Sequence, residues 1–281
     1  MHGAPPGPGH GEAAASTRPA ELAELAELAE ALCAARAVLV LTGAGLSADS
    51  GMPTYRGVGG LYEAQHTEEG YAIEDALSIG MLHARPEVCW RYLRQIDEAS
   101  GQAAPNAGHE ALAALEQALP GMWTLTQNVD GLHARAGSQR LIEMHGRRGD
   151  LYCMDCAAPM AAAQARAFVQ ALATLPPRCA CGGVLRPRVV LFGEMLPEAA
   201  IAQYTQVLEA EPEVVIAVGT SAVFPYIQAP LLEARGRGAL AVDINPGASD
   251  ISGAVHWHWR ERAAVALPRL AQAVAARQAG G

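Results

Sequence analysis

Four of the six cysteines occur as two close pairs, a spacing typical of a metal site. The pairs are Cys153-Met-Asp-Cys156 and Cys179-Ala-Cys181, with 22 residues between them, and Gly182-Gly183 supplies a tight turn after the second pair. In a cytosolic chain this pattern favours a tetrahedral four-cysteine zinc site over disulfides. Because four thiolates close the coordination sphere, we expect the zinc to be structural.

The segment LTGAGLSADSGMPTYRG, residues 41–57, begins like a phosphate-binding turn that follows an apolar run. The backbone N–H groups of Gly43, Ala44 and Gly45 could meet a pyrophosphate there. A dinucleotide-binding helix should start next, but Pro53 and several glycines prevent a long helix. A dehydrogenase also needs an acidic residue at the end of a second strand about 20 residues on. The nearest glutamates follow no predicted strand, so hydride transfer is disfavoured.

Two further groups of residues could contact a bound nucleotide. Arg56, beside the aromatic Tyr55, places a cation in a glycine-rich loop that can close over a ligand and exclude water. Gln127, Asn128 and Asp130 follow a predicted strand, and the carboxamide of nicotinamide needs both donors and acceptors.

Alternating apolar runs and helical stretches predict an α/β fold. Expected strands lie in 37–41, 122–128, 186–194, 214–221 and 239–246, and expected helices in 107–119, 198–210 and 226–235. This order indicates a Rossmann-like parallel sheet with helices on both faces, which binds ligands at the carboxyl ends of its strands. The repeat ELAELAELAEALCAA, residues 21–35, predicts an amphipathic helix that packs on this domain.

Two segments interrupt the alternation, and we expect them to form a second, smaller module. These are a cofactor loop and helical insert, 57–105, and a zinc-ribbon insert, 147–187. The sequence thus predicts a Rossmann-like nucleotide-binding domain of three pieces with a disordered N-terminal tail and a short C-terminal one. The pieces are 19–56, 106–146 and 188–272, and the tails are 1–18 and 273–281.

The composition excludes several classes of partner. The net charge is −9, all 20 basic residues are arginine, and no apolar stretch is long enough to span a membrane. The N-terminus does not have the pattern of a signal peptide. We therefore expect a cytoplasmic monomer with no nucleic-acid or membrane partner. Cys33 and Cys89 are predicted to be core residues, and the segment HWHW, residues 256–259, to be a strand or loop that packs its aromatics.

Eight motifs in one order resemble a sirtuin, an NAD-dependent protein lysine deacylase. The resemblance spans about residues 30–270, and its motifs are GAGLSADSGMPTYRG, PNAGH, TQNVDGLH, EMHG, the cysteine pairs, GGVLRPRVVLFGE, GTS and INP. The resemblance implies that the acyl-lysine carbonyl oxygen attacks the ribose carbon of NAD and displaces nicotinamide. A ribose hydroxyl then attacks the resulting imidate, giving lysine and O-acyl-ADP-ribose.

The same resemblance implies a role for each matching residue. His145 is the general base, with an ordinary pKa near 6.5 that suits this work. Asn128 and Asp130 hold the nicotinamide amide, and Gln127 lies near its ribose. Other NAD contacts come from the turn at 43–45 and from Ser47, Tyr55, Arg56, Gly219, Thr220, Ser221 and Asn245. The acyl-peptide channel is flanked by Val190, Phe192, Gly193, Glu194, Val223 and Phe224, where a peptide can add as a strand.

The preferred acyl chain is less clear from the motifs. Pro-Thr-Tyr-Arg at 53–56 resembles a subgroup that includes desuccinylases, which read acidic acyl chains with a Tyr-x-x-Arg pair before PNAGH. The matching positions here are Leu93 and Ile96, which are both apolar. We therefore predict an apolar acyl pocket that favours acetyl or longer aliphatic groups over succinyl. A shift of one helical turn would instead recruit Arg91 or Arg94.

Two other functions remain open at the level of sequence. One is mono-ADP-ribosyl transfer to protein by the same nicotinamide-displacing site. The other is a non-catalytic module that binds NAD or ADP-ribose and recruits partners through its zinc ribbon.

Overall fold

A computed structural model describes residues 19–52, 69–99 and 103–280, and its main layer is a parallel sheet. The sheet has six strands in the order β3-β2-β1-β7-β8-β9, and every neighbouring pair is parallel. Their bounds are β1 Val38–Thr42, β2 Met122–Thr126, β3 Leu141–Glu143, β7 Val214–Val218, β8 Leu240–Ile244 and β9 Trp257–Trp259.

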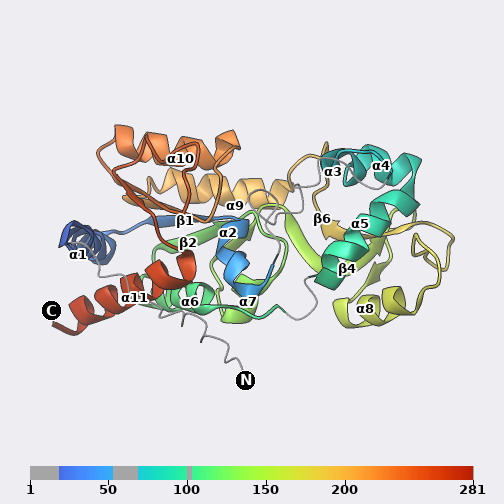
Figure 1. Ribbon diagram of the computed structural model, residues 1–281, viewed down its shortest axis with the longest axis horizontal. Helices are drawn as coiled ribbons and strands as arrows, with labels where there is room; N and C mark the ends of the chain where they lie inside the picture. The colour runs from blue at the N-terminus through green and yellow to red at the C-terminus, as the bar shows by residue number, and fades with distance from the viewer. Residues whose placement is uncertain (1–18, 53–68, 100–102, 281) are drawn as a thin grey trace, which may run out of the picture.

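Helices cover both faces of this sheet because its strands are apolar on both sides (Figure 1). One face packs on α1 (Pro19–Ala34), α6 (Ala107–Ala118) and α11 (Ala263–Gly280), and the other on α9 (Glu198–Glu209) and α10 (Pro225–Gly236). Along β1, Val38 and Val40 face the first layer, whereas Leu39 and Leu41 face the second. The predicted Rossmann-like fold is confirmed. In the described ranges, no helix combines the length and apolarity needed to cross a membrane.

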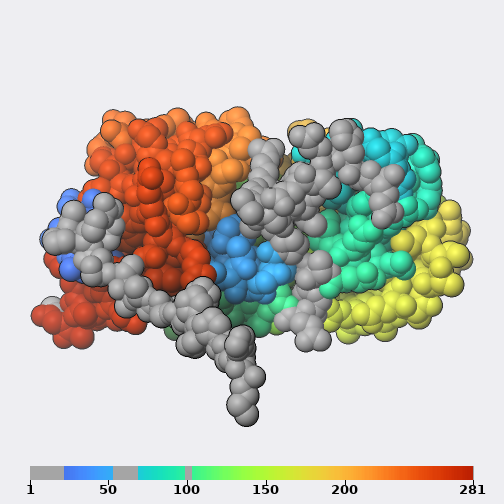
Figure 2. Space-filling model, in the orientation of Figure 1, coloured from blue at the N-terminus to red at the C-terminus, as the bar shows by residue number. Residues whose placement is uncertain are grey.

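The two interrupting segments pack together as a smaller module, as predicted (Figures 1 and 2). One supplies α3 (Ile73–Ala76), α4 (Ile79–Ala84) and α5 (Pro86–Ala99). The other supplies α8 (Ala162–Ala171) and an antiparallel sheet of β4 (Gly146–Cys153), β5 (Pro159–Met160) and β6 (Leu185–Val189). The Trp90 indole on α5 donates a 2.8 Å hydrogen bond to the Leu185 carbonyl on β6, within a shared apolar core.

Three expectations are wrong. The strand predicted at 186–194 does not join the parallel sheet, because β6 pairs with β4 and buries Leu185 and Val189 in the smaller module. Residues 273–280 are no tail but continue α11, since Val274 is buried beneath α1. Cys33 is exposed, whereas Cys89 is a core residue as expected. The predicted disordered tail, 1–18, lies outside the described residues.

The turns after β1 and β7 touch each other through backbone alone. The first leads into a single helical turn, α2 (Ala44–Ser47), and a short 3-10 helix (Ala48–Ser50) that ends at the left-handed Gly51. The turn therefore leads into no long helix, as the sequence predicts. Gly45 N–H donates a 2.8 Å hydrogen bond to the Gly219 carbonyl. A Cβ at Gly219 would lie 2.4 Å from the Leu46 nitrogen, so these turns meet only because glycines occupy both.

We predict that Gly219→Ala lowers the free energy of unfolding by about 3 kcal/mol. The added Cβ would overlap the backbone at Leu46, and the φ of 57° at this position lies in the left-handed region that disfavours alanine. Gly236→Ala is the control, because a Cβ there meets nothing within 4 Å at the end of α10. Denaturant unfolding of both variants measures the difference. Equal stabilities would refute this close approach.

Candidate NAD and acyl-lysine site

The predicted site residues converge at the carboxyl ends of β1, β2 and β7. These strands are adjacent in the order β2-β1-β7, so the loops that follow them share one edge of the sheet (Figure 1). In the space-filling view the segment 44–50 lies at the surface between the sheet domain and the smaller module (Figure 2).

Asn128 is buried and joins the loops after β1 and β2. Its side-chain amide donates to the Gly43 carbonyl at 3.0 Å and to Ser47 Oγ at 3.1 Å. Its backbone N–H donates to Thr126 Oγ1 at 3.1 Å. These bonds fix the amide, so its carbonyl oxygen has one defined orientation.

Asp130 connects Ser47 to the start of α7 (Leu132–Ala136). Ser47 Oγ donates a 2.8 Å hydrogen bond to Asp130 Oδ2, and Asp130 Oδ1 accepts from the Leu132 backbone N–H at 2.8 Å. The carboxylate therefore stabilises the first turn of a helix while it stays part-exposed at the site. Ser47 is buried within this network, and its expected phosphate contact remains a prediction.

Two buried histidines, His109 and His133, support this network, although neither is among the predicted site residues. His109 Nδ1 accepts from the Asn106 N–H at 3.3 Å, so in the neutral ring Nε2 carries the proton and faces Ser47 Oγ at 3.4 Å. His133 Nε2 lies 2.9 Å from Thr42 Oγ1. Burial lowers the pKa of His109 to about 4 and that of His133 to about 3, so both rings stay neutral. The role of His109 could have been predicted from the PNAGH motif, in which Asn106 and His109 form a capping box.

The loop after β7 is held by side chains from β2 and β8. Gln127 Nε2 donates to Thr220 Oγ1 at 2.8 Å, and Asn245 Nδ2 donates to the Thr220 carbonyl at 2.9 Å. Ser221 is exposed beside them. Residues expected to contact NAD thus come together from three separate parts of the chain.

One expectation for this site is wrong in detail. The N–H groups of Gly43 and Gly45 do not point to a ligand, because they donate to the Val218 and Gly219 carbonyls at 3.1 and 2.8 Å. The two glycines instead allow the turns after β1 and β7 to approach. A pyrophosphate contact from Ala44 remains a prediction.

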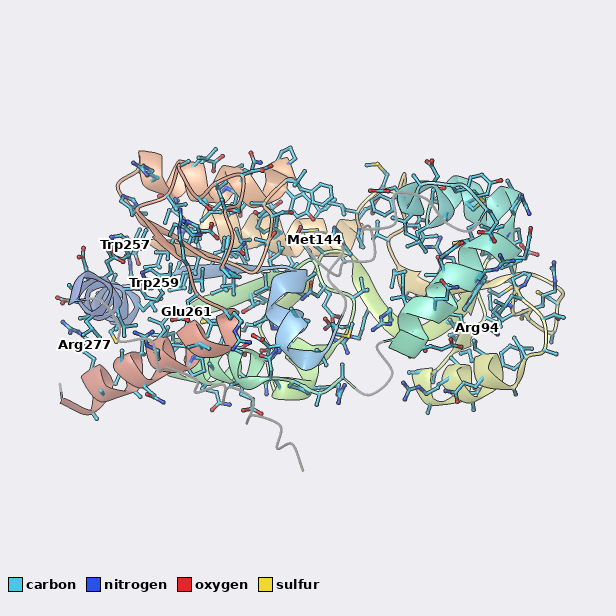
Figure 3. The ribbon with its side chains drawn as sticks, in the orientation of Figure 1. Arg94, Met144, Trp257, Trp259, Glu261 and Arg277 are labelled. Atoms are coloured by element: carbon cyan, nitrogen blue, oxygen red, sulfur yellow. The ribbon has the colours of Figure 1, made fainter. Side chains whose placement is uncertain are left out.

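His145 lies where the chain passes from the large sheet to the small one. It stands between β3 and β4, directly after Met144, which Figure 3 places between the two parts of the molecule. Its Nδ1 lies 2.9 Å from the Gln127 carbonyl, and because a carbonyl can only accept, Nδ1 carries the proton. The lone pair of Nε2 is then the basic site of the ring.

The surroundings of His145 keep it neutral. Burial lowers its pKa below the ordinary 6.5, and the hydrogen bond to the Gln127 carbonyl offsets part of this. The Phe224 ring stands edge-on at 6.1 Å. A neutral imidazole of this kind can accept a proton at neutral pH.

An extended segment after β6 links His145 to the helical insert. The Val190 N–H donates to the His145 carbonyl at 2.9 Å, and the Phe192 N–H donates to the Leu77 carbonyl at 3.1 Å. The side chains of Phe192, Val223 and Phe224 remain about 40% exposed. Val190 and Phe224 thus lie against the histidine, while Phe192, Val223 and Phe224 present exposed apolar groups.

Glu194 holds the end of this segment in place. Arg186 donates to its two carboxylate oxygens at 2.6 and 2.8 Å, and the Leu191 N–H donates at 2.7 Å. Burial alone would raise the pKa of Glu194, but these hydrogen bonds outweigh it and lower the pKa. Its expected contact with substrate remains a prediction, because its oxygens already have these partners.

The four paired cysteines gather at one point of the smaller module. Their sulfurs lie within 4.8 Å of one another, with Cys153 to Cys181 at 3.5 Å and Cys156 to Cys179 at 3.7 Å. Sulfurs bound to one tetrahedral zinc are about 3.8 Å apart, so this set fits the ion. Gly183 permits the approach, since a Cβ there would lie 2.7 Å from Cys153 Sγ. Among the described residues, these are the side chains grouped closely enough to hold a metal.

Comparison with known proteins decides the family. The Sir2 family pattern matches residues 43–225. The chain is 51% identical over 243 residues to NAD-dependent protein deacylase 2 of Pseudomonas aeruginosa, a match covering 85% of this chain and 93% of that protein. The chain belongs to the Sir2 family. An NAD-dependent protein deacylase of Aquifex aeolicus is 37% identical over 235 residues, or 83% of this chain and 93% of that protein.

Solved structures agree with this assignment to the Sir2 family. A complex of a Sir2 homologue with NAD has a TM-score of 0.77 and 33% identity, covering 91% of this chain and 94% of that one. A Sir2 complex with a deacetylated p53 peptide and 3′-O-acetyl ADP-ribose has a TM-score of 0.77 and 27% identity, covering 89% of this chain and 97% of that one.

The expected acyl-pocket residues of this Sir2 family protein lie on α5. Ile96 is buried and Leu93 half-buried in an apolar cluster of the helical insert. The polar residues beside them have partners in the chain: Arg91 and Tyr92 bind Glu69, and Arg94 pairs with Glu98 at 3.5 Å. Tyr55 and Arg56 lie outside the described residues.

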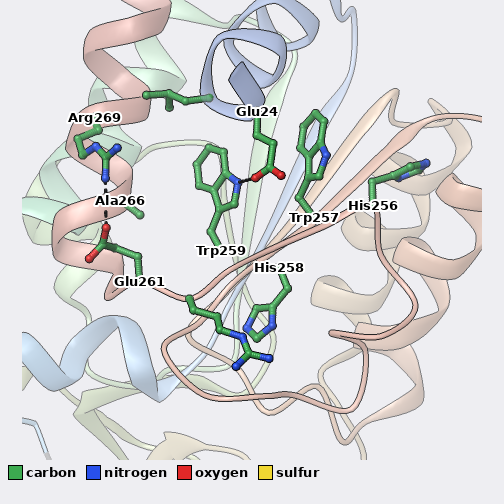
Figure 4. Close-up of a pocket in the computed structure, with 10 residues that line it drawn as sticks. Glu24, His256, Trp257, His258, Trp259, Glu261, Ala266 and Arg269 are labelled. Carbon is green, nitrogen blue, oxygen red and sulfur yellow. Dashed lines mark hydrogen bonds and ion pairs between the residues drawn. The ribbon is translucent and has the colours of Figure 1, made fainter. Parts of the chain in front are cut away.

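The HWHW segment forms the edge strand β9 and packs its aromatics, as expected. Trp259 Nε1 donates to Glu24 on α1 at 3.0 Å, at a pocket of about 290 Å³ that Figure 4 shows. Strands β8 and β7 separate this edge from β1, so the pocket is remote from His145.

We predict that Cys179→Ser removes bound zinc and lowers the temperature of unfolding, because a hydroxyl replaces one thiolate ligand. Cys33→Ser, at an exposed cysteine outside the cluster, should retain the metal. Metal analysis by mass spectrometry and thermal unfolding measure both effects. Full zinc content in Cys179→Ser would contradict the assigned ligand set.

We predict that Glu194→Gln lowers the free energy of unfolding by about 2 kcal/mol at pH 7, because it leaves the buried Arg186 guanidinium without a counter-charge. Since the folded pKa of Glu194 is depressed, its contribution is present above the ordinary value of 4.5 and is lost as pH falls through the folded pKa. Unfolding curves of both proteins between pH 7 and pH 3 should therefore converge on acidification. If the difference in free energy of unfolding between the two proteins did not change with pH, the ion pair would not be its cause.

Proposed function

We propose that this Sir2 family chain removes acyl groups from protein lysine side chains and consumes NAD as a co-substrate. The products are nicotinamide and O-acyl-ADP-ribose. The observation that carries the proposal is the position of His145, which is neutral and held by the Gln127 carbonyl next to the Asn128–Asp130 network. The Pseudomonas and Aquifex relatives bear the name of deacylases that use NAD, which supports the same reaction here.

Each part of the network then has a task. Asn128 and Asp130 orient the nicotinamide amide, while Gln127, Thr220, Ser221, Asn245 and the turn at 43–47 hold the rest of NAD. His145 accepts a proton from a ribose hydroxyl, which makes the oxygen nucleophilic towards the acyl carbon. Phe192, Val223 and Phe224 exclude water around the acyl-lysine. The zinc ion, held by the four thiolates, keeps the smaller module folded.

We further propose that the acyl pocket favours acetyl and longer aliphatic groups over succinyl. Leu93 and Ile96 are apolar, and the nearby Arg91 and Arg94 already have carboxylate partners in the chain. An acidic acyl chain would have to compete with these partners. A monomer that acts in the cytoplasm on acylated proteins, without nucleic-acid or membrane partners, is consistent with the net charge of −9.

The test is incubation with NAD and one lysine peptide carrying acetyl, octanoyl or succinyl, with both products weighed by mass spectrometry. Deacylated peptide with O-acyl-ADP-ribose supports the proposal, and acetyl should react faster than succinyl. A heavier protein acceptor would indicate ADP-ribosyl transfer, and no turnover would indicate a binding module. Because the chain contains no lysine, acyl-lysine of its own cannot contribute background.

We predict that His145→Ala lowers kcat/KM for deacylation by about 100-fold or more, the range expected for loss of a general base. In the wild type, kcat/KM should fall on acidification with an apparent pKa below 6.5, since burial disfavours the charged imidazole. His256→Ala, at an exposed histidine near the remote β9 edge, is the control. Full activity in His145→Ala would remove the assigned base.

A further inference from the structure

Both ring nitrogens of His145 have partners inside the protein. Nδ1 donates to the Gln127 carbonyl at 2.9 Å, and the Tyr226 hydroxyl lies 2.8 Å from Nε2. Because Nε2 has no proton in this tautomer, the tyrosine donates to it. The lone pair that has to accept a substrate proton is therefore occupied by a phenol hydroxyl.

Tyr226 is held firmly in this position. It is the second residue of α10, and its ring stacks on Phe224 with centroids 5.7 Å apart and planes at 16°. Its carbonyl accepts a 2.6 Å hydrogen bond from the hydroxyl of Tyr204 on α9, and the next residue, Ile227, is fully buried. The backbone at the start of α10 is thus fixed, and the stack on Phe224 favours the ring orientation that puts the hydroxyl on Nε2.

We propose that Tyr226 relays the proton between the ribose hydroxyl of NAD and His145. This inference rests on the proposed function. The ribose O–H gives its proton to the Tyr226 oxygen while the Tyr226 O–H gives its own to Nε2. The ribose oxygen keeps the electron pair of its broken O–H bond and forms the bond to the acyl carbon, while the π pair of the imidate C=N bond moves to the lysine nitrogen. His145 ends as imidazolium, and Tyr226 is regenerated as a neutral phenol.

The environment of Tyr226 suits a relay. Burial raises its pKa above the ordinary 10.0, so the phenol keeps a proton to donate throughout the working range. The other polar group at the ring, the Gln127 carbonyl, accepts from Nδ1 and offers no proton. No feature of the sequence around GTSAVFPYIQ indicated this role, because Tyr226 meets His145 only through the fold.

The experiment compares Tyr226→Phe with the wild type in two assays that use NAD and an acetyl-lysine peptide. Exchange of labelled nicotinamide into NAD reports the first step, which needs no base. Deacylation also requires the proton transfer. We expect exchange within about twofold of wild type and deacylation reduced about 100-fold. Tyr152→Phe, which removes a hydroxyl from β4 and keeps the ring that faces Arg186 and Arg188, is the control.

A proton inventory separates a relay from a purely structural role. The measurement is made where nicotinamide exchange is faster than deacylation, so that the later step limits the rate. A plot of the wild-type deacylation rate against the fraction of D2O should then be curved, because two protons move in one step. The residual activity of Tyr226→Phe should fall along a straight line. A structural role would not change this shape.

Several outcomes would overturn the relay. Deacylation by Tyr226→Phe within about twofold of wild type would show that the hydroxyl carries no proton, and faster deacylation would show that it only blocks Nε2. Equal loss of exchange and deacylation in a folded variant would place Tyr226 in binding instead. If the wild type neither exchanges nicotinamide nor deacylates, the proposed function itself fails, which is a different result.

Discussion

The architecture of the site depends on the backbone contact between the turns after β1 and β7. Gly45 N–H donates to the Gly219 carbonyl at 2.8 Å, and a Cβ at Gly219 would overlap the Leu46 nitrogen. This contact brings Ser47 into reach of Asn128 and Asp130 on one side, and Thr220 into reach of Gln127 on the other. The network of residues from three strands thus depends on the close approach of these two turns.

The geometry of the site also depends on the point where the chain leaves the large sheet. His145 follows β3 and precedes β4, so its ring belongs to neither regular layer and its position depends on both. Gln127 from the large sheet binds Nδ1, Tyr226 from α10 lies on Nε2, and Val190 from the small module binds the backbone carbonyl. Any displacement of the two parts of the molecule would therefore change the environment of the base. The Arg186–Glu194 pair and the cysteine cluster stabilise the small-module side of this junction.

Much of the fold followed from local patterns. Short, mainly apolar runs between helices predicted β1, β2, β7 and β8, because these strands are largely buried on both faces. The pattern failed for 186–194, which contains the apolar run VVLF but begins in a strand that pairs with β4, since a strand's partner depends on contacts distant in sequence. It failed again at 273–280, where alanine-rich residues continue α11 because Val274 has a core to enter.

The sequence by itself determined the family, the chemistry of the zinc ligands and the identity of the proposed base, because each depends on residue types at fixed spacing along the chain. Only the tertiary structure decided how these residues are used. In the fold, the N–H groups of Gly43 and Gly45 donate to carbonyls at the end of β7. His109 contacts Ser47, and the Tyr226 hydroxyl binds the lone pair of His145. These contacts join residues at least 62 positions apart, and hydrogen bonds over such separations arise from packing rather than from local sequence.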